Sequence, residues 1–107
     1  MIMSASYESI KKFMKKLDMK VFMLPEIYEK GKIRISLKVR RGNQLEYFSV
    51  DWFHMDDDGK LEWYDSDLEV GVEDGIFNYF ASKSDVDDFF IEMSLSFAEK
   101  YLADKIG

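Results

Sequence analysis

The only histidine of the chain, His54, is the only side chain whose ordinary pKa suits it to act as a base near neutral pH. A serine–histidine–aspartate arrangement would have to use it, and no G-x-S-x-G motif supplies a nucleophile. The chain has no cysteine, which removes thiol chemistry, disulfides and the common zinc ligand sets. We therefore expect no catalytic residue, no metal and no cofactor.

The segment 54–65 partly resembles a calcium-binding loop. Asp56 and Asp58 fall at its third and fifth positions, and Asp65 falls at its twelfth. His54, however, occupies the first position, where aspartate is expected, and the flanking residues are typical of strands rather than helices. An Asp-Asp-Gly sequence is common in hairpin turns without any metal, so the pattern predicts a turn.

Acidic and aromatic residues are concentrated together in one part of the chain. Ten acidic residues and one lysine lie between Asp51 and Asp74, among Trp52, Phe53, Trp63 and Tyr64. Trp and Tyr are favoured as interface anchors, and complementary charge speeds association. We call residues 56–74 the acidic strip, and the expected partner-binding residues in it are Asp56, Asp57, Asp58, Trp63, Asp65, Asp67, Glu69, Glu73 and Asp74. The alternative is that the acids only solvate the protein and that the aromatic residues are core.

The charge of the chain is divided unevenly along its length. The net charge is −6, made up of +7 over residues 1–41 and −13 over residues 42–107. The bases of the first part could form a surface for nucleic acid, but a domain with this net charge lacks the usual basic footprint. We therefore do not expect direct nucleic-acid binding, and the expected partner is a protein with a basic surface.

The clearest structural signal is a hairpin centred on Gly42-Asn43. Apolar and polar residues alternate over 33–40, as in a half-buried strand, and glycine at the first loop position favours a type II′ turn. Pairing Arg41 with Gln44 predicts Leu37 opposite Phe48, Ile35 opposite Val50, Ile33 opposite Trp52 and Arg34 opposite Asp51. This register brings apolar residues together on one face and opposite charges together on the other.

The hairpin is preceded by a predicted helix and a predicted edge strand. Apolar residues recur at helical spacing over residues 6–18, and Ser6 is a suitable N-cap. Residues 20–28 are typical of a strand, and Pro25 places that strand at a sheet edge because proline cannot donate to a ladder. The apolar residues of the helix form one stripe.

The second half of the chain predicts at least one more strand and a long closing helix. A strand is expected over residues 60–64, whereas residues 65–81 fit either strand or helix on the two sides of a turn at 73–75. The helix is expected over residues 84–106, with Ser84 as its N-cap and acidic residues in its first turn.

This closing helix carries two apolar stripes instead of one. The first stripe consists of Val86, Phe89, Phe90, Met93, Phe97 and Tyr101. The second consists of Ile91, Leu95, Leu102 and Ile106, about 150° away at 100° per residue. One stripe is enough to cover a sheet. The second is therefore expected to be covered by the first helix or by another chain.

Taken together, these patterns predict one α+β domain over residues 1–107. It has an N-terminal helix, an antiparallel meander of four or more strands, and a long C-terminal helix packed on one face of the sheet. The expected function is that of a non-enzymatic binding module, a small acidic inhibitor or immunity-type protein that occludes a basic surface, such as a nucleic-acid-binding one, on its partner. The alternative is a chaperone or assembly protein that dimerises through the C-terminal helix. No apolar run is long enough to span a membrane, and a cytoplasmic location is expected.

Overall fold

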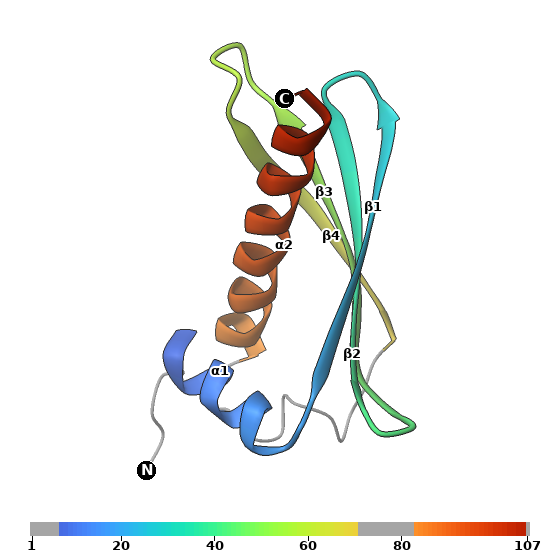
Figure 1. The fold of residues 1–107 in the computed structure, drawn as a ribbon, viewed down its shortest axis with the longest axis vertical. Coiled ribbons are helices and arrows are strands. Elements are labelled where there is room, and N and C mark those ends of the chain that lie inside the picture. The colour runs from blue at the N-terminus through green and yellow to red at the C-terminus, as the bar shows by residue number, and fades with distance from the viewer. Residues whose placement is uncertain (1–6, 71–82, 107) are drawn as a thin grey trace.

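The computed structural model describes residues 7–70 and 83–106 as six elements in chain order. These are α1 (Tyr7–Lys16), β1 (Lys20–Glu29), β2 (Lys32–Arg41), β3 (Gln44–Met55), β4 (Leu61–Val70) and α2 (Lys83–Ile106). The strands form one antiparallel sheet in the order β1-β2-β3-β4, and α2 runs along one face of it (Figure 1). The predicted α+β class, with a helix at each end of a four-stranded meander, is confirmed.

Helix α1 is short and ends in a defined cap. Its buried residues, Ile10 and Met14, lie one turn apart and face the sheet, while the lysines between them are exposed. Asp18 follows in a left-handed conformation, with a φ of 54°. The Met19 N–H donates to the Met14 carbonyl at 2.9 Å and the Asp18 N–H donates to the Lys15 carbonyl at 3.1 Å, which is the Schellman pattern of helix ends.

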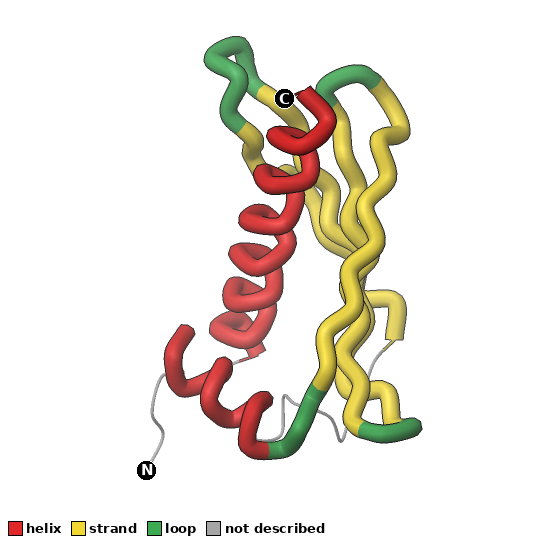
Figure 2. Tube along the Cα trace, viewed as in Figure 1, coloured by secondary structure: helices red, strands yellow, loops and turns green. Residues whose placement is uncertain are grey.

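The turns lie at opposite ends of the molecule. The β2–β3 turn at Gly42-Asn43 lies at the same end as α1, whereas the β1–β2 and β3–β4 turns lie at the other end (Figure 2). Gly42 has a φ of 59°, as the predicted turn requires of its first residue. Among the described strands, β1, which contains Pro25, pairs only with β2, in agreement with the predicted edge position.

The last strand is longer than predicted. Strand β4 begins at Leu61 and continues to Val70, so residues 65–70 are strand. The predicted turn at 73–75 and the segment after it lie outside the described residues. Helix α2 begins at Lys83, one residue before the predicted cap.

The predicted register of the β2–β3 hairpin is wrong by one residue along most of its length. Arg41 pairs with Gln44 as expected, but Ile35 lies opposite Asp51 instead of Val50. A shift of one residue turns every later side chain of β3 to the other face of the sheet. The residues facing the helices are therefore Tyr47, Ser49, Asp51 and Phe53, and those on the opposite face are Phe48, Val50, Trp52 and His54.

The cause of the shift is a β-bulge at Glu46, the extra residue between the pairs made by Leu45 and Tyr47. Glu46 is fully buried, and Arg41 Nε lies 3.0 Å from its Oε1, a charge contact that is not aligned as a hydrogen bond. No apolar pattern marks such an insertion. The predicted register matched apolar residues across the hairpin, but β3 carries apolar residues on both of its faces.

The core lies between the sheet and the helices in two adjoining clusters. At the end near α1, Ile10 and Phe90 pack with Val39. At the other end, Phe53 and Ala98 belong to a second cluster on β2, β3 and β4. Full burial of each large side chain contributes roughly 1.5–3 kcal/mol, so these clusters hold α2 against the sheet.

Helix α2 buries one broad arc, and this explains its two stripes. Ser94 and Ala98 are fully buried at the centre of the arc, where their small side chains let the helix approach the sheet closely. Leu95 and Leu102 flank that centre and pack against the second core cluster, and Ile91 is half-buried. Leu95 and Leu102 are thus covered by the chain's own sheet, and not by the first helix or another chain as predicted, while the side chain of Ile106 is not described. Neither helix of the described chain has the length and apolar character needed to cross a membrane.

Candidate binding surface

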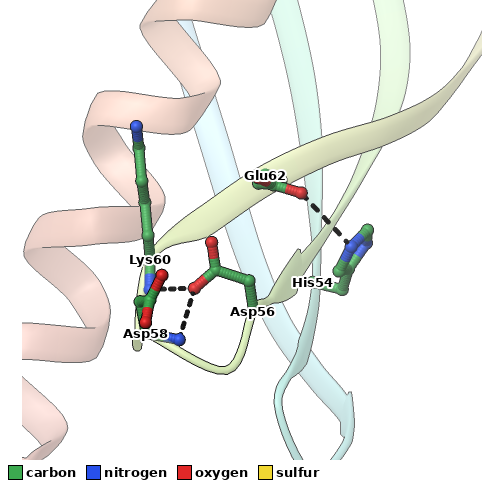
Figure 3. A network of polar contacts seen from close by, with 5 residues as sticks. All are labelled: His54, Asp56, Asp58, Lys60 and Glu62. Atoms are coloured by element: carbon green, nitrogen blue, oxygen red, sulfur yellow. Dashed lines mark hydrogen bonds and ion pairs between the residues drawn. The ribbon is translucent and has the colours of Figure 1, made fainter.

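The β3–β4 turn is shaped by the carboxylate of Asp56 (Figure 3). Asp56 Oδ1 accepts hydrogen bonds from the backbone N–H groups of Asp58 and Lys60, each at 2.9 Å. Gly59 adopts a φ of 81°, which glycine tolerates, and closes the turn. Asp57 and Asp58 are exposed at its tip. In the described chain no three histidine, aspartate or glutamate side chains converge as metal ligands.

His54 lies on the face of the sheet opposite the helices. Its Nε2 is 3.7 Å from Glu62 Oε2 on β4, and its ring packs at 5.3 Å from that of Tyr64 (Figure 3 shows the first contact). The Tyr64 hydroxyl shares a hydrogen bond with that of Tyr28 on β1, so the two tyrosines meet across this face. His54 is therefore packed among a carboxylate and a phenol, and no serine hydroxyl of the described residues bonds to it.

A polar network, exposed at Trp63 and buried at Ser94, links Trp63 to helix α2. The Trp63 indole N–H donates to Ser66 Oγ at 2.8 Å, and Ser66 donates in turn to Asp51 Oδ1. On the other side of the carboxylate, Ser94 Oγ donates to Asp51 Oδ2 at 2.9 Å. Burial raises the pKa of Asp51, while the two serine hydroxyls favour its charged form and Asp87 opposes it. Trp63 is thereby fixed on the helix side of β4.

The predicted site residues are divided among three places. Asp56, Asp57 and Asp58 form the turn, Trp63 lies on the helix side of β4, and Asp65 and Asp67 lie on the opposite face across from Trp52 and Val50. Glu69 belongs to β4, but its side chain is not described, and Glu73 and Asp74 lie outside the described residues.

The exposed carboxylates follow strand β4 and the turn before it. Among the described strands, β4 pairs only with β3 and is the last of the sheet. We call the exposed carboxylates of the turn and of β4 the acidic edge: Asp57, Asp58, Glu62, Asp65 and Asp67. Among the described residues, Asp57, Asp58, Asp65 and Asp67 have no cation within ion-pair distance. Trp63 and Tyr64, each 44% exposed, lie between these acids.

A second surface was not predicted from the sequence: it is the face of the sheet that neither described helix covers. Phe22 and Leu24 of β1 are 54% and 67% exposed there, beside the half-buried Phe48. These residues line a shallow groove of about 550 Å³ together with Lys38, whose Nζ lies 5.5 Å from the centre of the Phe48 ring. The unbroken apolar run over residues 21–24 was the signal, because a strand covered on one face alternates and this one does not.

Compared with protein-family models, with curated proteins and with solved structures, the chain has no match in any of the three. The description of both surfaces therefore uses only the geometry of this chain.

Proposed function

We propose that this protein is a non-enzymatic protein-binding module that covers a basic surface of its partner, as a small acidic inhibitor or immunity-type protein does. The observation that carries the proposal is the acidic edge, whose exposed carboxylates lie before and after Trp63 and Tyr64 along the turn and β4. Four of its five acids have no cation of the described chain to pair with. Carboxylates that are not paired with lysine or arginine of their own chain can attract the basic side chains of a partner.

The arrangement provides both parts of an interface. The half-exposed rings of Trp63 and Tyr64 supply apolar contact area, and tryptophan and tyrosine are the residue types that dominate binding energy when a partner covers them. The carboxylates of the turn and of β4 supply charge complementarity, which mainly raises the rate of association and its sensitivity to salt. The hydrogen bond to Ser66 holds Trp63 in place before binding, which reduces the entropy lost in the complex.

The same surface is unsuited to nucleic acid, because its carboxylates repel phosphates. The alternative of a dimer through α2 is not supported by exposed apolar surface. Among the described residues of that helix, no large apolar side chain is exposed. We place the proposed activity in the cytoplasm, where a chain without cysteine suits the reducing conditions.

Affinity capture with matched variants tests the proposal. The wild-type protein, immobilised, should retain a basic protein from a lysate of its source cells, and retention should fall as salt is raised. The variant Asp57→Lys/Asp58→Lys should lose most of that protein. The control Glu92→Lys/Glu99→Lys makes the same charge change on the exposed side of α2 and should retain it. Equal capture by both variants would refute a role for the acidic edge.

The contribution of Trp63 is tested separately once the partner is purified. Replacing Trp63 with alanine should weaken binding by about 2 kcal/mol if the ring is an anchor. Circular dichroism of the variant distinguishes this loss from unfolding, because Trp63 also donates to Ser66. Unchanged affinity in a folded variant would show that Trp63 is not an anchor and that binding does not depend on its ring.

A further inference from the structure

The uncovered face of the sheet is too apolar to be an ordinary solvent face. An antiparallel sheet with helices on one side normally alternates apolar residues inward with polar residues outward. Here Phe22 and Leu24 on β1 and Phe48 and Trp52 on β3 all lie on the outward side. Phe22 and Leu24 are more than half exposed, and the described residues do not cover them. An exposed apolar patch of this kind commonly marks an interaction site.

Lys32, Arg34 and His54 on this face each lie beside a glutamate of a neighbouring strand, and other charged residues form two separate regions. Near α1 lie Lys38 and Arg40 of β2, which line the groove beside Phe22. Across the sheet lie Asp65 and Asp67, on the β4 side of the same face. No ion pair within the described chain joins the two regions. The face therefore has a basic corner and an acidic margin on the two sides of its apolar residues, and the Arg34–Glu26 ion pair lies beside Trp52 with its charges offset.

This charge pattern decides what kind of molecule fits. Single-stranded nucleic acid would match the basic corner and the aromatic rings, but its phosphates would meet Asp65 and Asp67 at the other side. A fitting partner carries both signs of charge in the reverse order around an apolar centre. A second copy of this same chain presents that pattern.

We propose that the uncovered face is the interface of a two-fold symmetric homodimer. A two-fold axis brings the same surface of both copies together, so every contact occurs twice. If the two sheets cross at a large angle, the basic corner of each copy, with Lys38, lies over the acidic margin of the other, with Asp67. The apolar residues of the two copies then meet in the middle. Such crossed packing of two sheets is one of the two common arrangements.

This inference goes beyond the proposed function, because the dimer forms through the uncovered face of the sheet, which shares only Asp65, Asp67 and the adjoining Glu62 with the acidic edge. Asp57 and Asp58 at the turn and Trp63 on the helix side remain free for a partner when the uncovered faces meet. Association of the purified protein with itself can therefore be measured without any knowledge of the partner.

Analytical ultracentrifugation of the pure protein tests the dimer. The wild-type protein, a 12.7 kDa chain, should sediment as a concentration-dependent dimer between about 10 μM and about 1 mM, the range of weak to moderate affinities. Replacing Leu24 with glutamate should shift it to monomer, because a charge would then lie in the apolar middle. Leu24 is 67% exposed, so the change should not disturb the fold.

Charge reversal provides a second test that does not depend on apolar contacts. The variants Lys38→Glu/Arg40→Glu and Asp65→Lys/Asp67→Lys should each dimerise at least about tenfold more weakly, because like charges then face each other twice. Mixing the two variants should restore association, since each basic region again meets an acidic one. Lys100→Glu, on the exposed side of α2, is the control and should behave as wild type.

Three results would overturn the proposal. The first is a wild-type protein that stays monomeric over the whole concentration range. The second is a pair of charge variants that associate no better mixed than apart. The third is a monomeric protein that binds fluorescent oligo(dT) through Phe22 and Leu24, which would assign the face to nucleic acid instead.

Discussion

Replacing Ser94 with alanine tests whether the buried network at Asp51 holds α2 to the sheet. Ser94 and Asp51 are almost completely inaccessible to solvent, and the Ser94 hydroxyl donates to Asp51 Oδ2 at 2.9 Å. The substitution removes one oxygen atom and leaves the carboxylate oxygen without that donor. A hydrogen bond to a charged group contributes roughly 1.5–3 kcal/mol, so we expect a loss of about 2 kcal/mol near neutral pH. For a domain of this size that corresponds to a decrease in Tm of roughly 8–16 °C.

The size of this loss should depend on pH, and its sign follows from the raised pKa of Asp51. In the folded protein burial favours the protonated carboxyl, so Asp51 contributes most below its ordinary pKa of 3.8, and stability falls as pH rises through the higher folded pKa. Ser94 favours the charged form and limits that fall. Its removal should therefore cost about 1 kcal/mol near pH 4, where a neutral carboxyl accepts a weaker bond, and more near pH 7.

Urea unfolding followed by circular dichroism at both pH values measures these differences. Ser96→Ala is the matched control, because Ser96 is exposed on the same helix and its loss should change stability by less than about 0.5 kcal/mol. The reasoning is refuted if Ser94→Ala is no more destabilising than Ser96→Ala near neutral pH, or if its cost does not increase between the two pH values.

Three other predictions concern the fold and the turn. Gly42→Ala should lower the free energy of unfolding by about 1–2 kcal/mol from backbone strain alone, because nothing lies within 4 Å of the added Cβ; unchanged stability in urea would exclude the positive φ. Phe53→Ala should cost about 3–5 kcal/mol because the ring is fully buried, and a loss below about 1 kcal/mol would place it outside the core. Calorimetric titration with calcium should show no site tighter than about 10 μM, since the turn's backbone already occupies Asp56 Oδ1; sensor-like affinity would contradict this.

The elements of the fold follow from local patterns in the sequence. Glycine at position 42 favours the positive φ of a two-residue hairpin turn, so the hairpin was predictable. Proline in β1 cannot donate a ladder hydrogen bond, so the edge position of that strand was predictable too. The β2–β3 register was not, because the bulge at Glu46 inserts one residue without changing the apolar pattern on either side. Complementary pairs alone favoured the wrong alignment.

The candidate site was only partly predictable for a related reason. The acids of the turn were found because they cluster in sequence, but which face each residue of β4 occupies depends on pairing with β3. Trp63 and Asp65, two residues apart, lie on opposite faces because a second bulge shifts the register between them. The apolar surface of Phe22 and Leu24 was missed because residues 20–28 were predicted only as an edge strand, and their side chains were not assigned to its two faces.

The most direct test of the account is the association rate of the purified partner at several ionic strengths. For the wild-type protein the rate should be high at low salt and should fall as salt screens the acidic edge. For Asp57→Lys/Asp58→Lys it should be at least about tenfold lower at low salt, with little further dependence on ionic strength. Equal rates for the two proteins at low salt would contradict the claim that this surface meets a basic partner.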